Sequence, residues 1–299
     1  MKSFSRRETL AVGAGLALAP QTVLAAEKPL IKRPIPHSGE MLPAVGLGTA
    51  NGFDAQARAD LDAVIRALLA QGASVIDTAP SYGNAEEVIG DILAAQNARA
   101  KSFVATKLEG LDPAGAATEA QGCLSRLKTA KLDLLQLHNV NRPGQSLKGL
   151  NDLKAKGLIR YTGITTTYQG AYGAAEAILR REKPDFLEID YAIDNREAEN
   201  RVLPAAQDAG AAVLVALPFG RGRLFREVQK KPLPDFAAEI DCASWAQFFL
   251  KFLLGHPAVT GAIPGTTNPA HMIDDLNGAR GALPDAKMRA RMVQYVASI

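Results

Sequence analysis

The stretch SVIDTAPSYGNAEEVIG, residues 74–90, decides the fold that this sequence predicts. It starts with a short apolar run that closes on Asp77, passes through a loop that carries Tyr82, and then enters a helical pattern. A short apolar run bounded by turn residues is typical of a buried β-strand. The stretch therefore predicts one strand–loop–helix unit with polar side chains at the carboxyl end of its strand.

The same unit recurs along the chain. The predicted strand ends follow one another at steps of 29, 30, 31, 27, 25, 27 and 47 residues. One strand, one loop and one helix fit into about 30 residues. The eight ends are Gly48, Asp77, Lys107, His138, Thr165, Asp190, Leu217 and Pro264. This recurrence predicts an α/β fold, a (β/α)8 TIM barrel, in which catalytic groups gather at the carboxyl ends of the strands.

Length and charge bound the possible functions. A barrel of about 250 residues accounts for most of the 299 residues, so we expect a single domain over residues 27–299. The net charge is +3, from 34 basic and 31 acidic residues, which gives no case for nucleic-acid binding. Neither Cys123 nor Cys242 has a His or a second Cys at ligand spacing, so no metal site is predicted.

The first 26 residues resemble a processing segment. Arg6 and Arg7 precede an uncharged apolar run, and small residues follow before Glu27. A basic start, a short apolar run and small residues at a cleavage site describe a secretory signal, and paired arginines indicate the twin-arginine route. The run is too short for stable membrane insertion. We expect export to the bacterial periplasm; the alternative is a basic tail before an alanine-rich segment.

The order of four polar residues is specific for one family. DTAPSYGNAEEVIG, with Lys107 closing the next strand and QLH closing the one after, resembles the aldo-keto reductases over about residues 42–275. The resemblance implies a monomeric or loosely associated barrel that reduces small carbonyl compounds with NADP(H), or alternatively NAD(H). Residues 31–43, a predicted hairpin with its turn at Ser38 and Gly39, resemble the hairpin that closes the barrel floor in this family.

Carbonyl reduction needs a hydride on carbon and a proton on oxygen. The resemblance makes Tyr82 the general acid, and Lys107 would lower the phenol pKa from its usual value of about 10. Asp77 would hold Lys107 as an ion pair, and His138 would orient the substrate oxygen. Taken singly, Asp77 could cap a turn, Lys107 could point to solvent and His138 could be a core residue. The four together, in this order, favour catalysis.

The cofactor side departs from the family pattern. Thr165 and Thr166 stand where Ser-Asn is frequent, Glu188 replaces a Gln, and Leu217 falls near a position where a stacking Tyr is common. Gly265 and His271 replace a frequent Lys and Arg. The predicted cofactor-binding residues are Thr49, Asp77, Thr165, Thr166, Glu188, Leu217, Pro218, Phe219, Gly220, Arg221, Ile263, Pro264, Gly265, Thr266, Asn268, His271 and Asp275.

Two questions stay open at this point. The long, basic segment 218–241, with Arg221 and Arg223, is either a solvated loop or a flap over the cofactor pyrophosphate. The whole chain is either a carbonyl reductase or a non-catalytic nucleotide-binding barrel that serves as a sensor or an accessory subunit, because a fold does not settle a function. The intact set of four favours the enzyme, and the altered cofactor contacts favour the alternative.

Overall fold

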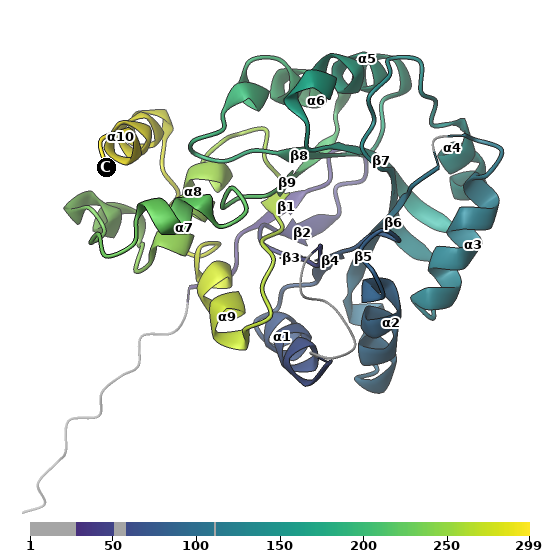
Figure 1. The fold of residues 1–299 in the computed structure, drawn as a ribbon, viewed down its shortest axis with the longest axis horizontal. Coiled ribbons are helices and arrows are strands. Elements are labelled where there is room, and N and C mark those ends of the chain that lie inside the picture. The colour runs from purple at the N-terminus through teal and green to yellow at the C-terminus, as the bar shows by residue number, and fades with distance from the viewer. Residues whose placement is uncertain (1–27, 51–57, 111) are drawn as a thin grey trace, which may run out of the picture.

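The computed structural model describes residues 28–50, 58–110 and 112–299, so the predicted signal segment 1–26 lies outside the described residues. Eight parallel strands follow one another in chain order around a single sheet, and helices surround it (Figure 1). The strands are β3 (Leu47–Gly48), β4 (Val75–Asp77), β5 (Phe103–Leu108), β6 (Leu132–Leu137), β7 (Ile159–Thr166), β8 (Phe186–Asp190), β9 (Ala212–Ala216) and β10 (Gly261–Ala262).

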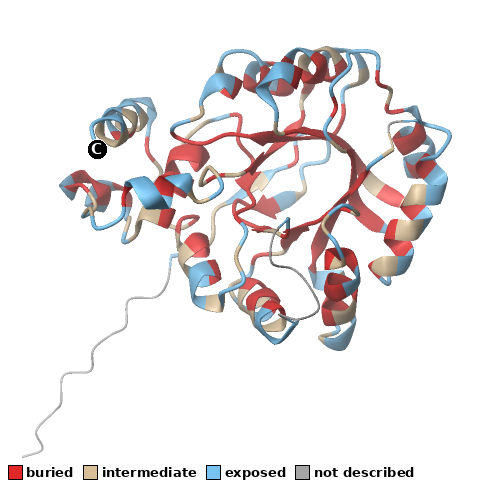
Figure 2. Cartoon of the chain, viewed as in Figure 1, coloured by how far each residue is buried: buried red, intermediate tan, exposed pale blue. Residues whose placement is uncertain are grey.

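The helices alternate with these strands and turn their buried faces inward (Figure 2). They are α1 (Arg58–Ala70), α2 (Ala85–Ala95), α3 (Ala116–Arg126), α4 (Lys148–Ala155), α5 (Tyr172–Glu182), α6 (Val202–Ala209), α7 (Arg223–Glu227), α8 (Trp245–Leu254), α9 (Pro269–Asn277) and α10 (Ala286–Ala297). Short 3₁₀ turns cover Arg99–Lys101, Gln169–Ala171, Glu197–Glu199 and Asp235–Ile240. Within the described ranges, no helix is long and apolar enough to cross a membrane.

The first and last strands of the sheet meet, so that the sheet curls into a barrel. Val45 forms a parallel bridge with Ala262, and the Gly48 N–H donates to the Pro264 carbonyl oxygen at 2.9 Å. A β-carbon at Gly48 would lie 2.6 Å from the Ile263 carbonyl oxygen, closer than atoms can pack. Glycine is therefore required at this closure. The (β/α)8 barrel predicted from the spacing of strand ends is confirmed, with every predicted end within two residues of the observed one.

The interior of the barrel is apolar at one end. Val75, Phe103, Phe186 and their neighbours form a cluster separate from the larger core between strands and helices. The same cluster contains Ile35 and Leu42 of the N-terminal hairpin. The two hairpin strands, β1 (Lys32–Pro34) and β2 (Met41–Pro43), pair antiparallel. Because this end is filled with side chains, polar groups of the barrel interior are found toward the carboxyl ends of the strands.

Segment 218–241 is more ordered than a loop. It contains the short helix α7 and the 3₁₀ turn Asp235–Ile240. Phe225 packs against Phe219 and Phe249, with ring centroids 4.8 and 6.0 Å away. The Trp245 indole N–H donates to the Lys231 carbonyl oxygen at 2.9 Å. Aromatic contacts thus fold this segment onto the barrel, which does not fit a solvated loop. A role as a flap over the cofactor pyrophosphate stays a prediction.

Candidate active site

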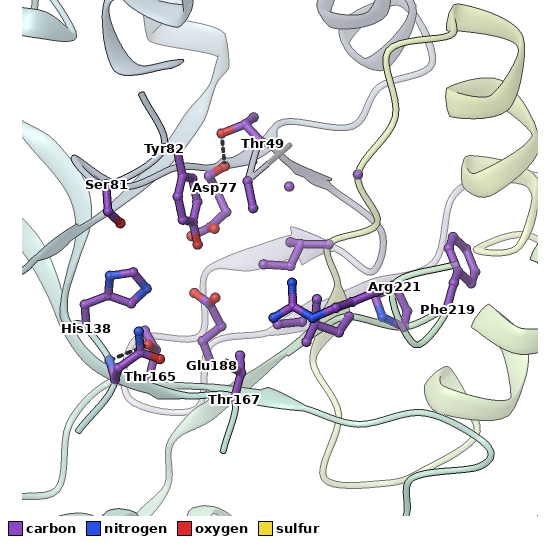
Figure 3. Close-up of a pocket in the computed structure, with 18 of the residues that line it drawn as sticks. Thr49, Asp77, Ser81, Tyr82, His138, Thr165, Thr167, Glu188, Phe219 and Arg221 are labelled. Carbon is purple, nitrogen blue, oxygen red and sulfur yellow. Dashed lines mark hydrogen bonds between the residues drawn. The ribbon is translucent and has the colours of Figure 1, made fainter. Parts of the chain in front are cut away.

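A cleft of about 740 Å³ opens at the carboxyl ends of the strands, and Asp77, Tyr82 and His138 line it (Figure 3). Two strand ends supply these side chains: Asp77 ends β4, Tyr82 lies in the loop after it, and His138 follows β6. Lys107 on β5 lies behind them, fully buried. The structure thus brings the four predicted catalytic residues to one place, although they span 62 positions of the sequence.

The Lys107 ammonium is held by strand geometry. Its Nζ donates to Asp77 Oδ2 at 2.6 Å and to the Thr78 carbonyl oxygen at 3.0 Å. β4 and β5 are parallel neighbours, with Asp77 opposite Ala105, which puts residue 107 within reach of the carboxylate. Asp77 does not serve as a turn cap, and Lys107 does not point to solvent. The ion pair expected between them is present.

A second carboxylate contacts the same ammonium. Glu188 Oε2 lies 3.4 Å from Lys107 Nζ and accepts a hydrogen bond from Gln136 Nε2 at 2.7 Å. Burial, and then the nearby Glu188, raise the pKa of Asp77 well above its usual range. Burial alone would lower the pKa of Lys107, but Asp77, Glu188 and Tyr82 outweigh it and raise that pKa. Sequence reasoning placed Glu188 against the cofactor and did not anticipate this contact.

Tyr82 keeps its proton more firmly than expected. The Lys107 ammonium lies 5.1 Å from the centre of the phenol ring and favours the phenolate. Burial raises the pKa of Tyr82, and with Asp77 and Glu188 it outweighs this effect of Lys107. The expectation of a lowered phenol pKa is therefore wrong, because two carboxylates and the dry surroundings act against one ammonium. At neutral pH the phenol is therefore protonated.

His138 stands beside Tyr82. The two rings meet edge to face with their centroids 6.0 Å apart, and the His138 backbone N–H donates to the Leu108 carbonyl oxygen at 3.0 Å. His138 Nδ1 lies 2.8 Å from Glu109 Oε1. Sequence reasoning missed Glu109, although strand alternation offered a signal: a residue two positions after Lys107 faces the same side.

The predicted cofactor-binding residues divide into two groups. The structure places ten of them on the lining of the cleft: Thr49, Asp77, Thr165, Glu188, Leu217, Pro218, Phe219, Arg221, Ile263 and Gly265. It places seven outside that lining: Thr166, Gly220, Pro264, Thr266, Asn268, His271 and Asp275. Ser81, Asn139 and Thr167 also line the cleft and were not predicted.

Two residues outside the lining stabilise the start of α9. The Asn268 side chain caps α9 by accepting from the Ala270 N–H at 2.9 Å, and the Thr266 hydroxyl accepts from the Asn268 N–H at 3.1 Å. Asp275 is buried on α9, and burial raises its pKa well above the usual range. His271 is exposed on the same helix. The contacts that these residues make with a cofactor stay predictions.

Two neighbouring arginines point in different directions. Arg221 lines the cleft, and Figure 3 shows its guanidinium directed into it. Arg223 donates instead to Asp194 Oδ2, with Nε at 2.9 Å. Leu217 and Arg221 both have positive φ angles, 53° and 55°, which side chains rarely adopt. Arg221 thus enters the cleft from a turn with rare backbone angles, and strain of this kind clusters at ligand sites.

Comparisons with known proteins agree with this geometry. The aldo/keto reductase family model matches residues 44–291. Methylglyoxal reductase YeaE of Escherichia coli K12 is 30% identical over 247 residues, which is 80% of this chain and 86% of that protein. An NADH-specific methylglyoxal reductase of the same organism is 26% identical over 222 residues, 65% of this chain and 67% of that protein.

Solved structures show the same fold. An aldo-keto reductase from Klebsiella pneumoniae in complex with NADPH has a TM-score of 0.72 at 24% identity, covering 90% of this chain and 95% of that chain. An aldo/keto reductase from the same organism in complex with NADP and acetate has a TM-score of 0.71 at 25% identity, covering 86% and 93%. The chain therefore belongs to the aldo/keto reductase family, NAD(P)-dependent oxidoreductases that act on carbonyl groups.

Proposed function

We propose that this protein reduces small aldehydes or ketones, with Tyr82 as the general acid. The convergence of Tyr82, Lys107 and His138 at one cleft supports the proposal. A protonated phenol beside a buried ammonium can give its proton to an alkoxide, and the ammonium then stabilises the phenolate that remains. The relatives named as methylglyoxal reductases support a small carbonyl substrate.

The residues of the cleft fit a nicotinamide cofactor, which supplies the hydride for the carbonyl carbon when it is bound. Arg221 offers a guanidinium that can form charge-assisted hydrogen bonds with a pyrophosphate. The Thr165 hydroxyl accepts from the Asn139 N–H at 3.1 Å and keeps its own proton to donate to an amide oxygen. We propose NADP(H) as the cofactor, with NAD(H) as the alternative, because relatives of both kinds exist.

The N-terminal hairpin has a structural role in this proposal. Ile35 and Leu42 belong to the same apolar cluster as Phe103 and Phe186 of the barrel interior, which supports a hairpin that closes the floor. Burying these side chains excludes water from the end of the barrel opposite the cleft. The cleft is then the route by which substrate and cofactor reach Lys107 and Tyr82.

We further propose that the protein works outside the cytoplasm. The support is the sequence around Arg6 and Arg7, which lies outside the described residues. The twin-arginine route carries folded proteins, so a cofactor can be loaded before export. An exported reductase of this kind starts its work with bound nucleotide.

The test is NADPH oxidation by the purified mature chain with a panel that includes methylglyoxal, other aldehydes and quinones. We expect carbonyl-dependent oxidation, followed by absorbance, and its loss in Tyr82→Phe. Nucleotide binding without turnover of any carbonyl compound would overturn the proposal and support the nucleotide-binding barrel without catalysis.

A further inference from the structure

One carboxylate connects the two groups that face the substrate. Glu109 Oε1 lies 2.8 Å from His138 Nδ1 and accepts from the backbone N–H of Ser81 at 3.2 Å. Ser81 directly precedes Tyr82, so a single oxygen contacts both the imidazole and the loop that carries the phenol. Glu109 itself follows β5, two residues after Lys107. One carboxylate oxygen thus connects the segments that follow three strands, β4, β5 and β6.

We infer that Glu109 is a positioning residue that fixes the tautomer of His138 and the place of the Tyr82 loop. The inference rests on the proposed reductase function for its catalytic consequence. The four-residue pattern of the family resemblance does not include Glu109; its hydrogen bond with His138 is what assigns it this role.

The direction of the hydrogen bond decides the tautomer. An ionised carboxylate has no proton to give, so the bond requires the proton on His138 Nδ1. Glu109 is ionised at neutral pH: burial raises its pKa, but the hydrogen bonds from Ser81 and His138 outweigh burial and lower it. The other ring nitrogen, Nε2, is thereby left for the substrate oxygen.

This arrangement suits both partners of a carbonyl–alcohol pair. A neutral imidazole with its proton on Nδ1 accepts a hydrogen bond from an alcohol at Nε2. A doubly protonated ring donates from Nε2 to a carbonyl oxygen. The opposite neutral tautomer has no proton on Nδ1 and so cannot donate to Glu109 in this geometry. Glu109 therefore determines which nitrogen meets the substrate.

Partial shielding makes the contact stronger than an ordinary surface pair. The His138 side chain is only 10% exposed, whereas the Glu109 side chain is 39% exposed. Fully exposed ion pairs contribute little to stability. The edge of the Tyr82 ring covers the other side of the imidazole, with the centroids 6.0 Å apart. The imidazole is therefore held from two sides, by Tyr82 and by Glu109.

A neighbouring glutamate provides a matched control. Glu119 accepts from the Gly110 N–H at 2.8 and 3.1 Å, and Gly110 is the residue after Glu109. Glu119→Gln thus alters a carboxylate that binds the backbone directly beside Glu109. Glu109→Gln keeps the size of the side chain, but its amide can donate to Nδ1 and so permits the other tautomer. Thermal unfolding of both variants checks that they fold.

The experiment measures the tautomer and the activity separately. In ¹⁵N-histidine-labelled protein, ring-nitrogen NMR of His138, assigned with His138→Asn, should show the proton on Nδ1 in the wild type and in Glu119→Gln. Glu109→Gln should show a changed or mixed tautomer. Its kcat/KM for carbonyl reduction should fall about 10-fold to 100-fold, the range for losing a hydrogen bond to a charged group. Glu109→Asp should recover part of that loss.

Two results would overturn the inference: an unchanged His138 spectrum in Glu109→Gln, or an equal loss of activity in Glu119→Gln. If the wild type reduces no carbonyl compound, the proposed function fails, and the NMR comparison alone decides whether Glu109 sets the tautomer.

Discussion

The Lys107 ammonium lies 2.6 Å from Asp77 Oδ2 in a part of the barrel where the two side chains are 0% and 3% exposed. Removing two charges from water is costly: burial raises the pKa of Asp77 although Lys107 opposes this, so their mutual attraction offsets only part of the cost, and only while both remain. Glu188, 3.4 Å from the same ammonium, adds a second negative group. The Lys107 ammonium therefore affects both the stability of the barrel and the proposed chemistry of the cleft.

Lys107→Met should lower both stability and activity. It leaves Asp77 and Glu188 buried without a cation, and breaking a buried pair costs about 3–5 kcal/mol. Urea unfolding measures the loss. Asp77→Leu added to Lys107→Met should restore part of the stability but none of the activity, since one unpaired charge is gone and the ammonium is still missing. A single variant as stable as the wild type would contradict the buried ion pair.

Glu188→Gln should change how stability depends on pH. In the folded chain burial and Glu188 raise the pKa of Asp77, so the folded state binds more protons than the unfolded state. Stability from this group is then complete below the unfolded pKa of about 4 and is lost as pH rises through the folded pKa. Without Glu188 the pKa of Asp77 falls and this loss shrinks.

The measurement is urea unfolding of the wild type and of Glu188→Gln at about pH 5 and about pH 8. Each unit by which the folded pKa of Asp77 exceeds its unfolded pKa is worth about 1.4 kcal/mol of stability. The wild type should lose more stability than Glu188→Gln between these values. Glu87→Gln, on the exposed side of α2, is the control and should behave like the wild type. Parallel curves for all three proteins would show that Glu188 does not act on Asp77.

Tyr82→Phe should abolish carbonyl reduction and leave nucleotide affinity nearly unchanged. The phenol hydroxyl is the proposed proton donor, and losing a general acid costs about 10²–10⁴-fold in rate. The ring that packs against His138 is kept, so the fold of the loop should survive. Steady-state kinetics and nucleotide titration give the two readouts. Retention of most of the wild-type rate would assign the proton to another group.

The barrel and the place of its polar residues could be predicted because both depend on local periodicity. Asp77, Lys107 and His138 each close an apolar run, and parallel strands bring such ends to one edge. The interactions between them could not be predicted in the same way. Glu188 reaches Lys107 across the barrel interior, from a strand that begins 79 residues later in the sequence.

Other features of the site depended on contacts that the sequence pattern does not encode. The short helix α7 was not predicted, because a five-residue helix that follows two glycines shows little hydrophobic periodicity. Arg221 and Arg223 looked equivalent in the sequence, and only the ion pair with Asp194 separates them. The direction of the Tyr82 pKa shift was predicted wrongly because burial and Glu188 were not visible.

Arg6→Lys combined with Arg7→Lys should retain the precursor in the cytoplasm, folded and active. The paired arginines before an uncharged apolar run are the feature that indicates the twin-arginine route. Lysine keeps the charge, so the variant tests the identity of the residues rather than the basic character of the segment. Cell fractionation with an antibody to the mature chain gives the answer. Unchanged export would refute this targeting.

Arg221→Ala should release nucleotide that the wild type retains through purification. The proposed export leaves the cytoplasmic cofactor pool behind, so slow dissociation is required, and affinity differences between related complexes lie mostly in the off-rate. Arg221 is directed into the cleft, whereas Arg223 is engaged with Asp194. We therefore expect copurified NADP(H) in the wild type and in Arg223→Ala, and its loss in Arg221→Ala. Chromatography of the nucleotide released by denaturation measures occupancy. Equal loss in both variants would mean that the segment acts through its fold, and full retention in Arg221→Ala would remove this guanidinium from the pyrophosphate site.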